Sequence, residues 1–427
     1  KEIPVPFTPV LKFAFKDESF IGNLEQCNGC GGCRKAPPTM CPTYAATGEE
    51  IMSTRGRANT IRAVLEQRLH EDALASESLA LALGSCLSCK ACTTECPSNV
   101  NMALLKAELL HARQRRDGIP LRERMISNVD LLGKLGSIVP SLTNAIMNAK
   151  VTRKLAEKIL GFASERPLPP YGPFRFDKWF ANRKRNGNTK RGRVILWDDT
   201  FVRYNEPDIG VAAVKVLEAA GYEVELLKGR ACCGRPAFSV GRLDMARKNG
   251  LRNIALLKDC TDPVVFLEPS CYSMFAEDYI ELGVPDAREV ARRCVPFEKF
   301  LFELLEREPE SLQFAPGYHW VAIHGHCHAK SLTKTAYMTK LCAKLPNATV
   351  TMLDTGCCGM AGAFGQMKSK YGLSLQVAKP LVEQIDKLTA GTEIVASGTS
   401  CRHQIDHLTD AKPIHMAELF AQALGPK

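Results

Sequence analysis

The sequence predicts a multidomain α+β protein in which an all-α domain is followed by two pseudo-symmetric α/β lobes. Three observations support this prediction. Eight cysteines lie in two tight groups within residues 27–96, with helix-like sequence between the groups. From residue 193 onward, short apolar runs alternate with helical patterns, which is typical of α/β folds with parallel sheets. The pattern after residue 318 repeats the pattern after residue 193, and each repeat contains a Cys-Cys-Gly triplet.

The composition indicates a globular chain of two or three domains. The chain has 427 residues, of which 45% are hydrophobic and 24% are charged. It has neither an apolar run long enough to cross a bilayer nor a signal peptide, and its first residue is not methionine. We therefore expect either part of a longer polypeptide or a separate subunit. Residues 1–26 are predicted to be an N-terminal segment ahead of the first domain.

The first predicted domain, residues 27–165, carries the two cysteine groups. The second group, Cys86 to Cys96 followed by Pro97, has the C-x2-C-x2-C-x3-C-P spacing of two-cluster ferredoxins, in which the fourth cysteine binds the other cluster. Paired C-x2-C knuckles would be more typical of four-cysteine zinc sites, which are the alternative. The spacing thus predicts two [4Fe-4S] clusters with exchanged fourth ligands: Cys27, Cys30, Cys33 and Cys96 for the first cluster, and Cys86, Cys89, Cys92 and Cys41 for the second.

Helical periodicity surrounds these cysteines. Residues 55–69 and 76–85 are predicted to be amphipathic helices between the two groups. Residues 100–116 are predicted to form a stronger helix, and helical patterns continue to about residue 165. The first domain is therefore expected to be an all-α version of the dicluster ferredoxin module.

A basic linker is predicted at residues 166–192. It begins with a proline-rich stretch, and the run from 182 to 193 carries only positive charges within a net charge of +10. A solvated linker is one interpretation, and a docking patch for an acidic protein or an anionic membrane surface is the other. The run lacks the interleaved aromatic residues and the helical periodicity of a nucleic-acid site.

Two α/β lobes are predicted at residues 193–310 and 318–427. Residues 193–197 and 222–227 are predicted to be strands, with a helix over 208–221, and residues 262–271 are predicted to be a strand that runs into a loop. Residues 320–328, 348–359 and 392–401 repeat the pattern of those three strands in the second lobe. The repeat predicts two related lobes packed about a pseudo-twofold axis.

Adjacent cysteines follow one predicted strand in each lobe. Cys232 and Cys233 precede Gly234, and Cys357 and Cys358 precede Gly359. Tight loops of this kind favour metal ligands, whereas a disulfide between neighbouring residues needs strained geometry and an oxidising setting. The remaining thiols, Cys260, Cys294 and Cys342, lie in apolar or helical stretches and are predicted to be core residues.

Several motifs resemble known families. CNGCGGCR (27–34) and MCPTYAATGEEIMSTRGRAN (40–59) are similar to segments of D-lactate and D-2-hydroxyglutarate dehydrogenase-like proteins, which are FAD-linked oxidases fused to an iron–sulfur half. The same module occurs in the iron–sulfur subunits of glycolate oxidase and anaerobic glycerol-3-phosphate dehydrogenase. The CCG segments resemble the cysteine-rich domain of heterodisulfide reductase, whose pattern is a lone cysteine, then CCG, then CxxC.

The last resemblance implies a third metal centre. The second lobe offers Cys327, Cys357, Cys358 and Cys401, with Gln404 at the final family position. The first lobe offers only Cys232, Cys233 and Cys271, with Thr200 and Met274 at the two remaining positions. We therefore expect one iron–sulfur or zinc centre, built mainly from the second lobe. His324, His326 and His328 surround Cys327, either to contact a metal, a quinone or another substrate, or to bond to backbone.

The resemblance as a whole implies the electron-transfer region of a flavin-linked D-2-hydroxy acid dehydrogenase. FAD would lie in an upstream domain or partner, because the chain has no Gly-rich nucleotide fingerprint, and no catalytic residue can be named. The expected acceptor is a quinone, a cytochrome or an electron-transfer protein. The expected location is cytoplasmic, with peripheral contact at the inner face of the membrane. Two alternatives are a heterodisulfide reductase-like catalytic subunit acting at the CCG site and a zinc-binding structural or DNA-binding module.

Overall fold

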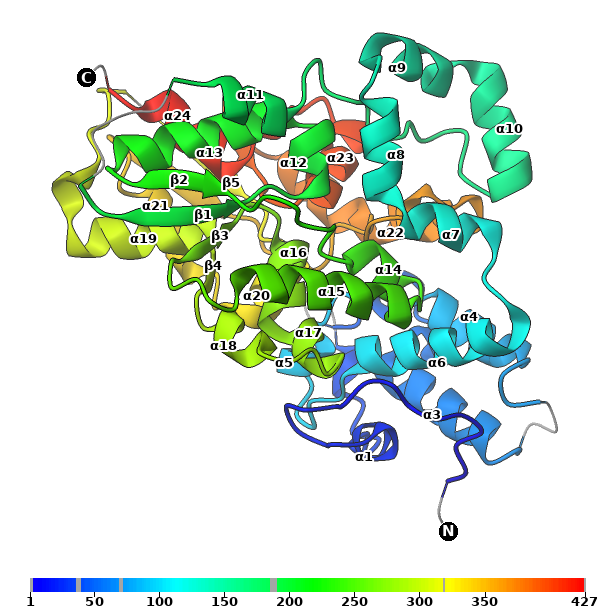
Figure 1. Cartoon of the computed structure of the whole chain (residues 1–427). Coiled ribbons are helices and arrows are strands. Elements are labelled where there is room, and N and C mark those ends of the chain that lie inside the picture. The colour runs from blue at the N-terminus through cyan, green and yellow to red at the C-terminus, as the bar shows by residue number, and fades with distance from the viewer. Residues whose placement is uncertain (1–2, 36–39, 69–71, 185–189, 318, 426–427) are drawn as a thin grey trace.

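A helical N-terminal domain packs beneath two small parallel sheets in this protein (Figure 1). The computed structural model describes residues 3–35, 40–68, 72–184, 190–317 and 319–425. The predicted combination of helices with parallel sheets is confirmed.

Short helices joined by cysteine-bearing loops make up the N-terminal domain. Side chains at the helix starts accept backbone N–H groups, as Ser53 does from Gly56 at 2.8 Å. The predicted helices here are confirmed, although the first ends at Leu65 instead of residue 69, which lies outside the described residues. The elements are α1 (Phe20–Glu25), a 3-10 turn (Gly32–Arg34), α2 (Pro42–Thr47), a 3-10 turn (Glu50–Met52), α3 (Thr54–Leu65), α4 (Glu77–Gly84), α5 (Cys92–Glu95) and α6 (Met102–Asp117).

The helical pattern predicted up to residue 165 is also confirmed. It forms α7 (Leu121–Ser127), α8 (Val129–Gly136), α9 (Pro140–Asn148) and α10 (Lys150–Leu160), and α11 (Phe176–Asn182) follows in the linker. Figure 1 shows α9 and α10 standing at the edge of the molecule, away from both sheets. Among the described helices, none has the length and apolar character needed to cross a membrane.

The first sheet has the order β2-β1-β3-β4, and all its strands are parallel. Its central strand is the predicted RVILW run, paired Val194 to Val224 on one side and Leu196 to Val265 on the other. The strands are β1 (Arg193–Trp197), β2 (Glu223–Leu226), β3 (Val264–Phe266) and β4 (Cys294–Pro296). The helices are α12 (Thr200–Tyr204), α13 (Pro207–Ala219), α14 (Arg235–Ser239), α15 (Leu243–Leu257), α16 (Pro269–Ser273), a π-turn (Met274–Asp278), α17 (Tyr279–Glu281), α18 (Ala287–Ala291) and α19 (Phe297–Arg307), followed by a 3-10 turn (Pro309–Ser311).

The second sheet has the order β6-β5-β7, again parallel, with its first strand in the centre. The strands are β5 (His319–Ile323), β6 (Ala348–Met352) and β7 (Glu393–Val395). The other elements are α20 (Cys327–Leu332), α21 (Ala336–Cys342), a 3-10 turn (Phe364–Gln366), α22 (Lys368–Ile385), α23 (Thr399–Leu408) and α24 (Met416–Ala423).

Two apolar cores tie these parts together. The larger core joins the N-terminal domain to one face of the first sheet, so Ile61 and Leu105 belong to the same buried cluster as Trp197 and Phe266. The second core lies between the other face of that sheet and the second sheet, where α13 packs against α24.

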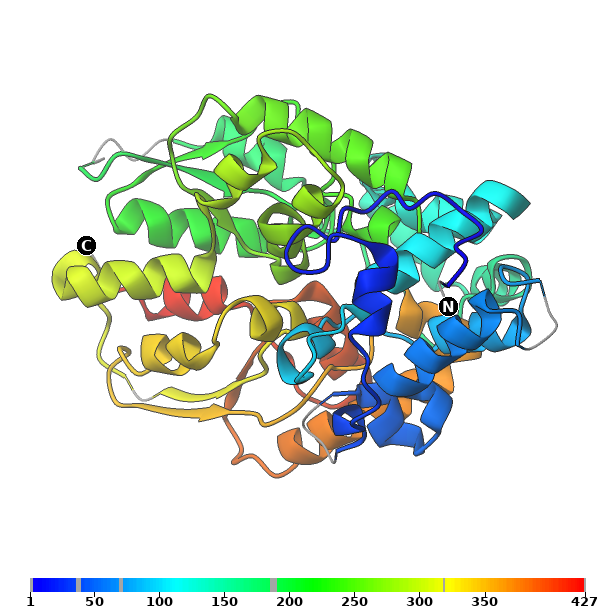
Figure 2. The same cartoon turned by 90° about the horizontal axis from the view of Figure 1, so that it is seen from below.

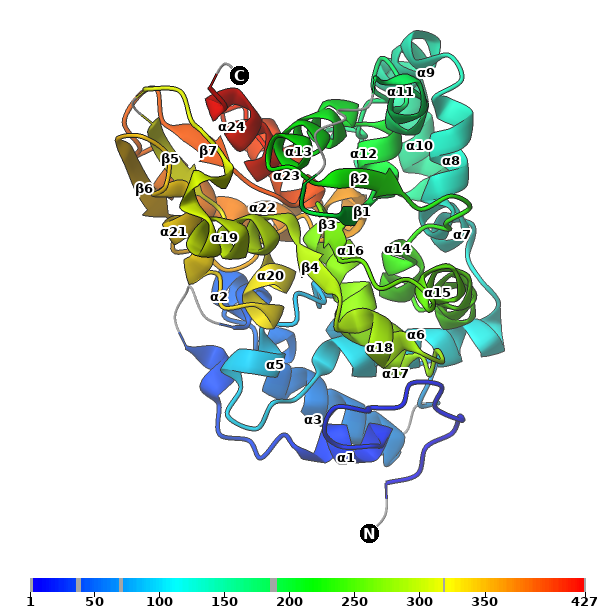
Figure 3. The ribbon, with the colours of Figure 1, turned by 60° about the vertical axis from the view of Figure 1, so that its left-hand side comes forward.

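The N-terminal domain lies against both sheet-bearing parts of the chain. Seen from below, the green first lobe and the yellow-to-red second lobe lie side by side, with the blue N-terminal helices beside them (Figure 2). Figure 3 shows the N-terminal helices α2 and α5 directly beneath α20 of the second sheet. The loops at the sheet ends therefore face the cysteine loops of the N-terminal domain.

Candidate metal centres

The first cysteine group wraps around a short turn near the protein surface. Cys33 is buried whereas Cys30 is exposed. The segment after the second group returns to this turn: a Cβ added to Gly32 would lie 3.5 Å from Pro97 Cδ and 3.7 Å from Cys30 Sγ. The chain thereby brings Pro97, next to Cys96, beside the first group.

The second group lines a small, partly enclosed cavity. Cys41 of the first group joins it there, and Cys96 is absent from the described lining. The four thiols that line this cavity are Cys41, Cys86, Cys89 and Cys92. Burial raises the pKa of Cys92 to about 12, so this thiol is neutral unless a metal ion displaces its proton.

Hydrogen bonds reach the sulfur atoms of both groups. The Arg55 amide donates to Cys33 Sγ at 3.3 Å, and the Ser88 amide donates to Cys86 Sγ at 3.4 Å. Burial would raise the pKa of Cys41, but the Arg57 guanidinium, whose Nη1 lies 3.2 Å from Cys41 Sγ, brings that pKa below its ordinary value. N–H donors and a cation of this kind stabilise negative charge on sulfur, as metal–thiolate centres require.

The loop of the second group touches helical segments of both sheet-bearing parts of the chain. Lys90 Nζ is fully buried and lies 2.7 Å from Glu277 and 3.1 Å from Asp278. Both acids lie in the π-turn that follows α16, the helix that contains Cys271. The Ser88 carbonyl lies 3.1 Å from His328 Nε2, in the second sheet's α20. The second cysteine group therefore sits at the junction of all three parts of the chain.

Four thiols and one histidine converge at the carboxyl end of the second sheet. Cys327 begins α20, Cys357 and Cys358 follow β6, and Cys401 lies in α23. The ligand atoms of His324, Cys358 and Cys401 all lie within 4.8 Å of one another. His324 Nδ1 bonds Thr355 Oγ1 at 3.0 Å, whereas its Nε2 is buried without a hydrogen-bond partner among the described residues. An orphaned imidazole nitrogen beside thiols fits a metal ligand.

The thiols of this group differ in proton affinity. A hydrogen bond from Cys357 is the largest effect on Cys327 and lowers its pKa to about 7. Hydrogen bonds from Cys357 and Cys401, together with His324, hold the pKa of Cys358 well below its ordinary value. The same hydrogen bonds raise the pKa values of Cys357 and Cys401 well above the ordinary value, so a thiophilic metal bound here would have to displace the protons of those two thiols.

The other residues singled out near this group have different partners. His326 Nδ1 caps α20 by accepting the His328 amide at 3.1 Å. Gln404 accepts a hydrogen bond from the buried Arg166 and donates to Ser374, so its side chain is engaged away from the thiols. Of the three histidines in the motif, His324 is thus the one whose ring nitrogen groups with Cys358 and Cys401.

The first lobe brings its three cysteines together. Cys271 Sγ lies 3.0 Å from Cys233 Sγ, and Cys232 adjoins them. Burial raises the pKa of Cys271 to about 11, which keeps this thiol protonated. Met274, at another family position, is fully buried. Among the predicted core thiols, Cys294 and Cys342 are buried as expected, while Cys260 is only partly buried and lies 3.2 Å from Asp262 Oδ2.

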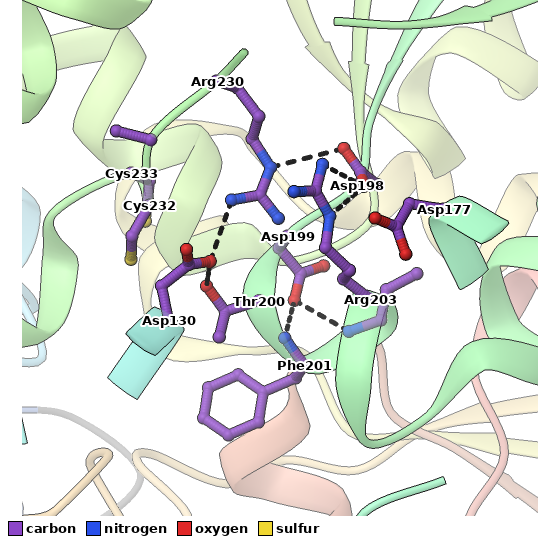
Figure 4. A network of polar contacts seen from close by, with 12 residues as sticks. Asp130, Asp177, Asp198, Asp199, Thr200, Phe201, Arg203, Arg230, Cys232 and Cys233 are labelled. Atoms are coloured by element: carbon purple, nitrogen blue, oxygen red, sulfur yellow. Dashed lines mark hydrogen bonds and ion pairs between the residues drawn. The ribbon is translucent and has the colours of Figure 1, made fainter. Parts of the chain in front are cut away.

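An ion-pair network occupies the place next to Cys232 (Figure 4). Thr200, which stands where the family has cysteine, donates to Asp130 Oδ1 at 3.0 Å. Arg230 lies 3.0 Å from the same Asp130 oxygen and 3.3 Å from Asp198, and these carboxylates raise the Arg230 pKa despite burial. Ion pairs and a hydrogen bond therefore fix Arg230, Asp130 and Thr200 next to Cys232.

Comparisons with known proteins agree with this arrangement. Residues 23–100 match the family model of the 4Fe-4S dicluster domain, and residues 200–276 and 321–406 match the cysteine-rich domain known as CCG. The resemblance inferred from the sequence is thereby confirmed: a dicluster iron–sulfur domain precedes two cysteine-rich segments.

Three relatives cover most of the chain. A subunit of anaerobic glycerol-3-phosphate dehydrogenase from Escherichia coli is 29% identical over 71% of this chain and 78% of its own length. A D-2-hydroxyglutarate dehydrogenase from Pseudomonas putida is 28% identical over 93% of this chain, which spans only 43% of that relative's length. A probable glycolate oxidase iron–sulfur subunit from Bacillus subtilis is 24% identical, with 97% of both chains covered.

Sequence reasoning missed the buried cations around the second group. Arg57 lies within the quoted motif of residues 40–59, but nothing in its spacing indicated a contact with Cys41. Lys90 lies between two predicted ligands, and its partner Asp278 is almost two hundred residues away in sequence. The available signal was the position of this lysine, because it lies in a loop between two predicted metal ligands.

Proposed function

We propose that this chain relays electrons between a flavin and an acceptor through iron–sulfur centres. Its relatives include iron–sulfur subunits and a dehydrogenase more than twice as long, so the hydroxy acid, the flavin and the whole enzyme's activity are inferred from those proteins. The substrate class we assign is a D-2-hydroxy acid of the D-lactate, D-2-hydroxyglutarate or glycolate type. The flavin belongs to another domain or subunit.

The contact between Ser88 and His328 carries this proposal. It joins the cavity of the second cysteine group to the thiols of the second lobe, and Cys89 and Cys327 pack against the same small apolar cluster. A relay requires its centres to be close and shielded from water, because electron transfer weakens with distance and side reactions need solvent. A continuous buried route from the first group to the second lobe would meet both needs.

The predicted ligand sets fit this role. Cys27, Cys30, Cys33 and Cys96 would hold one [4Fe-4S] cluster, and Cys41, Cys86, Cys89 and Cys92 would hold the other. Each cluster, when bound, accepts and releases one electron at a time. The chain's own contribution is to bury the thiolates and to donate N–H groups to sulfur, which stabilises the reduced state.

A third centre belongs to the second lobe in this proposal. Cys327, Cys357, Cys358 and Cys401 supply four thiols, and His324 adds a nitrogen ligand to the same group. The first lobe, with Cys232, Cys233 and Cys271, would be a pseudo-symmetric counterpart that lacks a full ligand set. Thr200 supports this division, because it stands where the family has a cysteine and bonds to Asp130 instead of offering a sulfur ligand.

The test uses the full chain purified without oxygen. We expect visible absorption and iron with sulfide for two cubanes, and no oxidation of D-lactate, D-2-hydroxyglutarate or glycolate by the chain alone. Reduced flavin should pass electrons through it to a cytochrome or a quinone analogue. Turnover of a hydroxy acid with no flavin present, or a colourless protein containing zinc, would overturn the proposal.

A further inference from the structure

Exposed apolar side chains gather in one part of the molecule that binds none of the proposed clusters. We call residues 129–160, which comprise α8, α9 and α10, the apolar arch. It lies between the two matched family regions. In the described part of the chain, ten of the sixteen exposed large apolar residues belong to it: Leu131, Leu132, Leu135, Ile138, Val139, Leu142, Ile146, Val151, Leu155 and Ile159.

Helix α10 turns its apolar side chains outward. Val151, Leu155 and Ile159 follow one another at four-residue spacing and are 78%, 53% and 61% exposed. Lys154 and Lys158 lie on the same exposed face, between the apolar positions. A helix on a water-exposed surface normally points its apolar face to the core, so this orientation indicates a missing neighbour.

The lysines around this face are without ion pairs among the described residues. Lys150, Lys154 and Lys158 of α10 and Lys134 of α8 have no acidic partner there, although many other cations of the chain do. Lysine can lay its aliphatic stem along an apolar surface while its ammonium reaches outward. Alternating aliphatic and lysine residues are therefore suited to a boundary between apolar and anionic material.

A cationic hollow adjoins the arch. It is lined by Ile138 and Pro140 of the arch and by Lys178 and Trp179 of α11. Arg175 and Arg183 also line it, but they already pair with Asp177 and Glu218. Lys178 is exposed, and exposed Lys184 and Lys190 of the basic linker lie beyond α11. Figure 1 shows α11 at the same edge of the molecule as α9.

We propose that the apolar arch docks on the surface of an anionic lipid bilayer, with its aliphatic residues among the acyl chains and its lysines among the headgroups. Interfacial helices combine aliphatic residues with Lys or Arg in this way. A protein interface fits the composition less well, because such interfaces are depleted in lysine and enriched in aromatic residues, and the ten exposed apolar residues of the arch are all Leu, Ile or Val. This inference is independent of the ligand sets proposed for the clusters.

Vesicle flotation of the full chain tests the proposal. We expect binding to vesicles of equal parts phosphatidylcholine and phosphatidylglycerol, and weaker binding to phosphatidylcholine alone. Replacing Val151, Leu155 and Ile159 together with Gln should lower partitioning at least about tenfold. Replacing Lys154 and Lys158 with Gln should remove much of the preference for anionic lipid and its sensitivity to salt.

Matched control variants distinguish binding through the apolar arch from non-specific binding through other exposed apolar residues. Leu251→Gln with Leu256→Gln changes two exposed leucines of α15 and should leave vesicle binding unchanged. Iron content and circular dichroism of each variant report folding, and hydrogen exchange of the unaltered chain should show protection of residues 140–160 on vesicles.

Three outcomes would overturn the proposal. The parent chain could fail to float, or the triple variant could bind as the parent does. Light scattering could also show a dimer that the triple variant loses while neither protein binds lipid, which would assign the arch to a second copy.

Discussion

Arg57 offers the sharpest test of how the second cysteine group works. Its guanidinium is fully buried and lies 3.2 Å from Cys41 Sγ. The same group donates to the Ala82 carbonyl at 2.8 Å, to Thr43 Oγ1 at 2.8 Å and to Ser85 Oγ at 2.9 Å. Replacing Arg57 with Gln removes a positive charge beside one predicted cluster while leaving every cysteine in place.

The magnitude follows from these distances. With the charge roughly 5.5 Å from the centre of a cluster bound at Cys41, an effective dielectric constant of about 20 gives an interaction of about 3 kcal/mol with an added electron. Since about 1.4 kcal/mol corresponds to about 59 mV for one electron, the midpoint potential should fall by roughly 130 mV. The orphaned hydrogen-bond acceptors should also lower the free energy of unfolding by ~3 kcal/mol or more.

Redox titration followed by electron paramagnetic resonance measures both clusters. Arg57→Lys keeps the charge and should keep most of the potential. Arg55→Gln changes a partly buried arginine on the same helix that pairs with Glu50 and contacts the first group, so it should shift the potential of the second cluster much less. Equal potentials in the parent and in Arg57→Gln would refute the electrostatic argument. A shift confined to the cluster of Cys27 and Cys33 would instead refute the exchange of fourth ligands.

Three further predictions concern other parts of the chain. Cys96→Ala should abolish the cluster held by the first cysteine group and spare the cluster held by the second group, as measured by spectroscopy with iron analysis. Loss of the second group's cluster instead would contradict the exchange of fourth ligands. His324→Ala should alter the spectrum or metal content of the second-lobe centre, whereas His326→Ala should leave both intact; equal effects would exclude His324 as a specific ligand. Burial and Glu268 raise the Asp199 pKa to about 7, so the folded state holds a proton that the unfolded state releases near pH 4, and stability from this group falls as pH rises from about 4 to 7. Asp199→Asn, which can still cap α12, should therefore raise the melting temperature at pH 8 but change it little at pH 4, and an equal change at both pH values would contradict the shift.

Local pattern predicted the elements well because their causes are local. The RVILW run is apolar throughout and becomes a strand buried at four of its five positions, as central parallel strands are. The cysteine spacings indicated the two groups because thiols two residues apart in a short loop can bind the same metal centre. In residues 262–271, Pro269 begins a helix directly after β3, so the expected loop around Cys271 is helical instead.

Contacts between distant segments could not be predicted from one sequence. His324, His326 and His328 stand at alternate positions, and their different roles depend on where β5 ends and α20 begins. Helical patterns up to about residue 165 were predicted, but only the structure shows that the apolar side chains of α10 point outward. Such facts depend on which surfaces the rest of the chain leaves free.

The junction at Ser88 and Lys90 also bears on how the protein is made. Lys90 is locked between carboxylates of the first lobe, and Ser88 lies against the second lobe, so the folded chain closes over the cavity of the second cysteine group. Residues 23–100 leave the ribosome before either lobe exists, since synthesis proceeds from the N-terminus and domains fold as they emerge. During that interval the cysteines are open to the machinery that delivers iron and sulfide. We therefore expect that a cluster lost after the lobes have docked is harder to replace than one lost before, because Lys90 and Ser88 then hold the loop of the second group against both lobes.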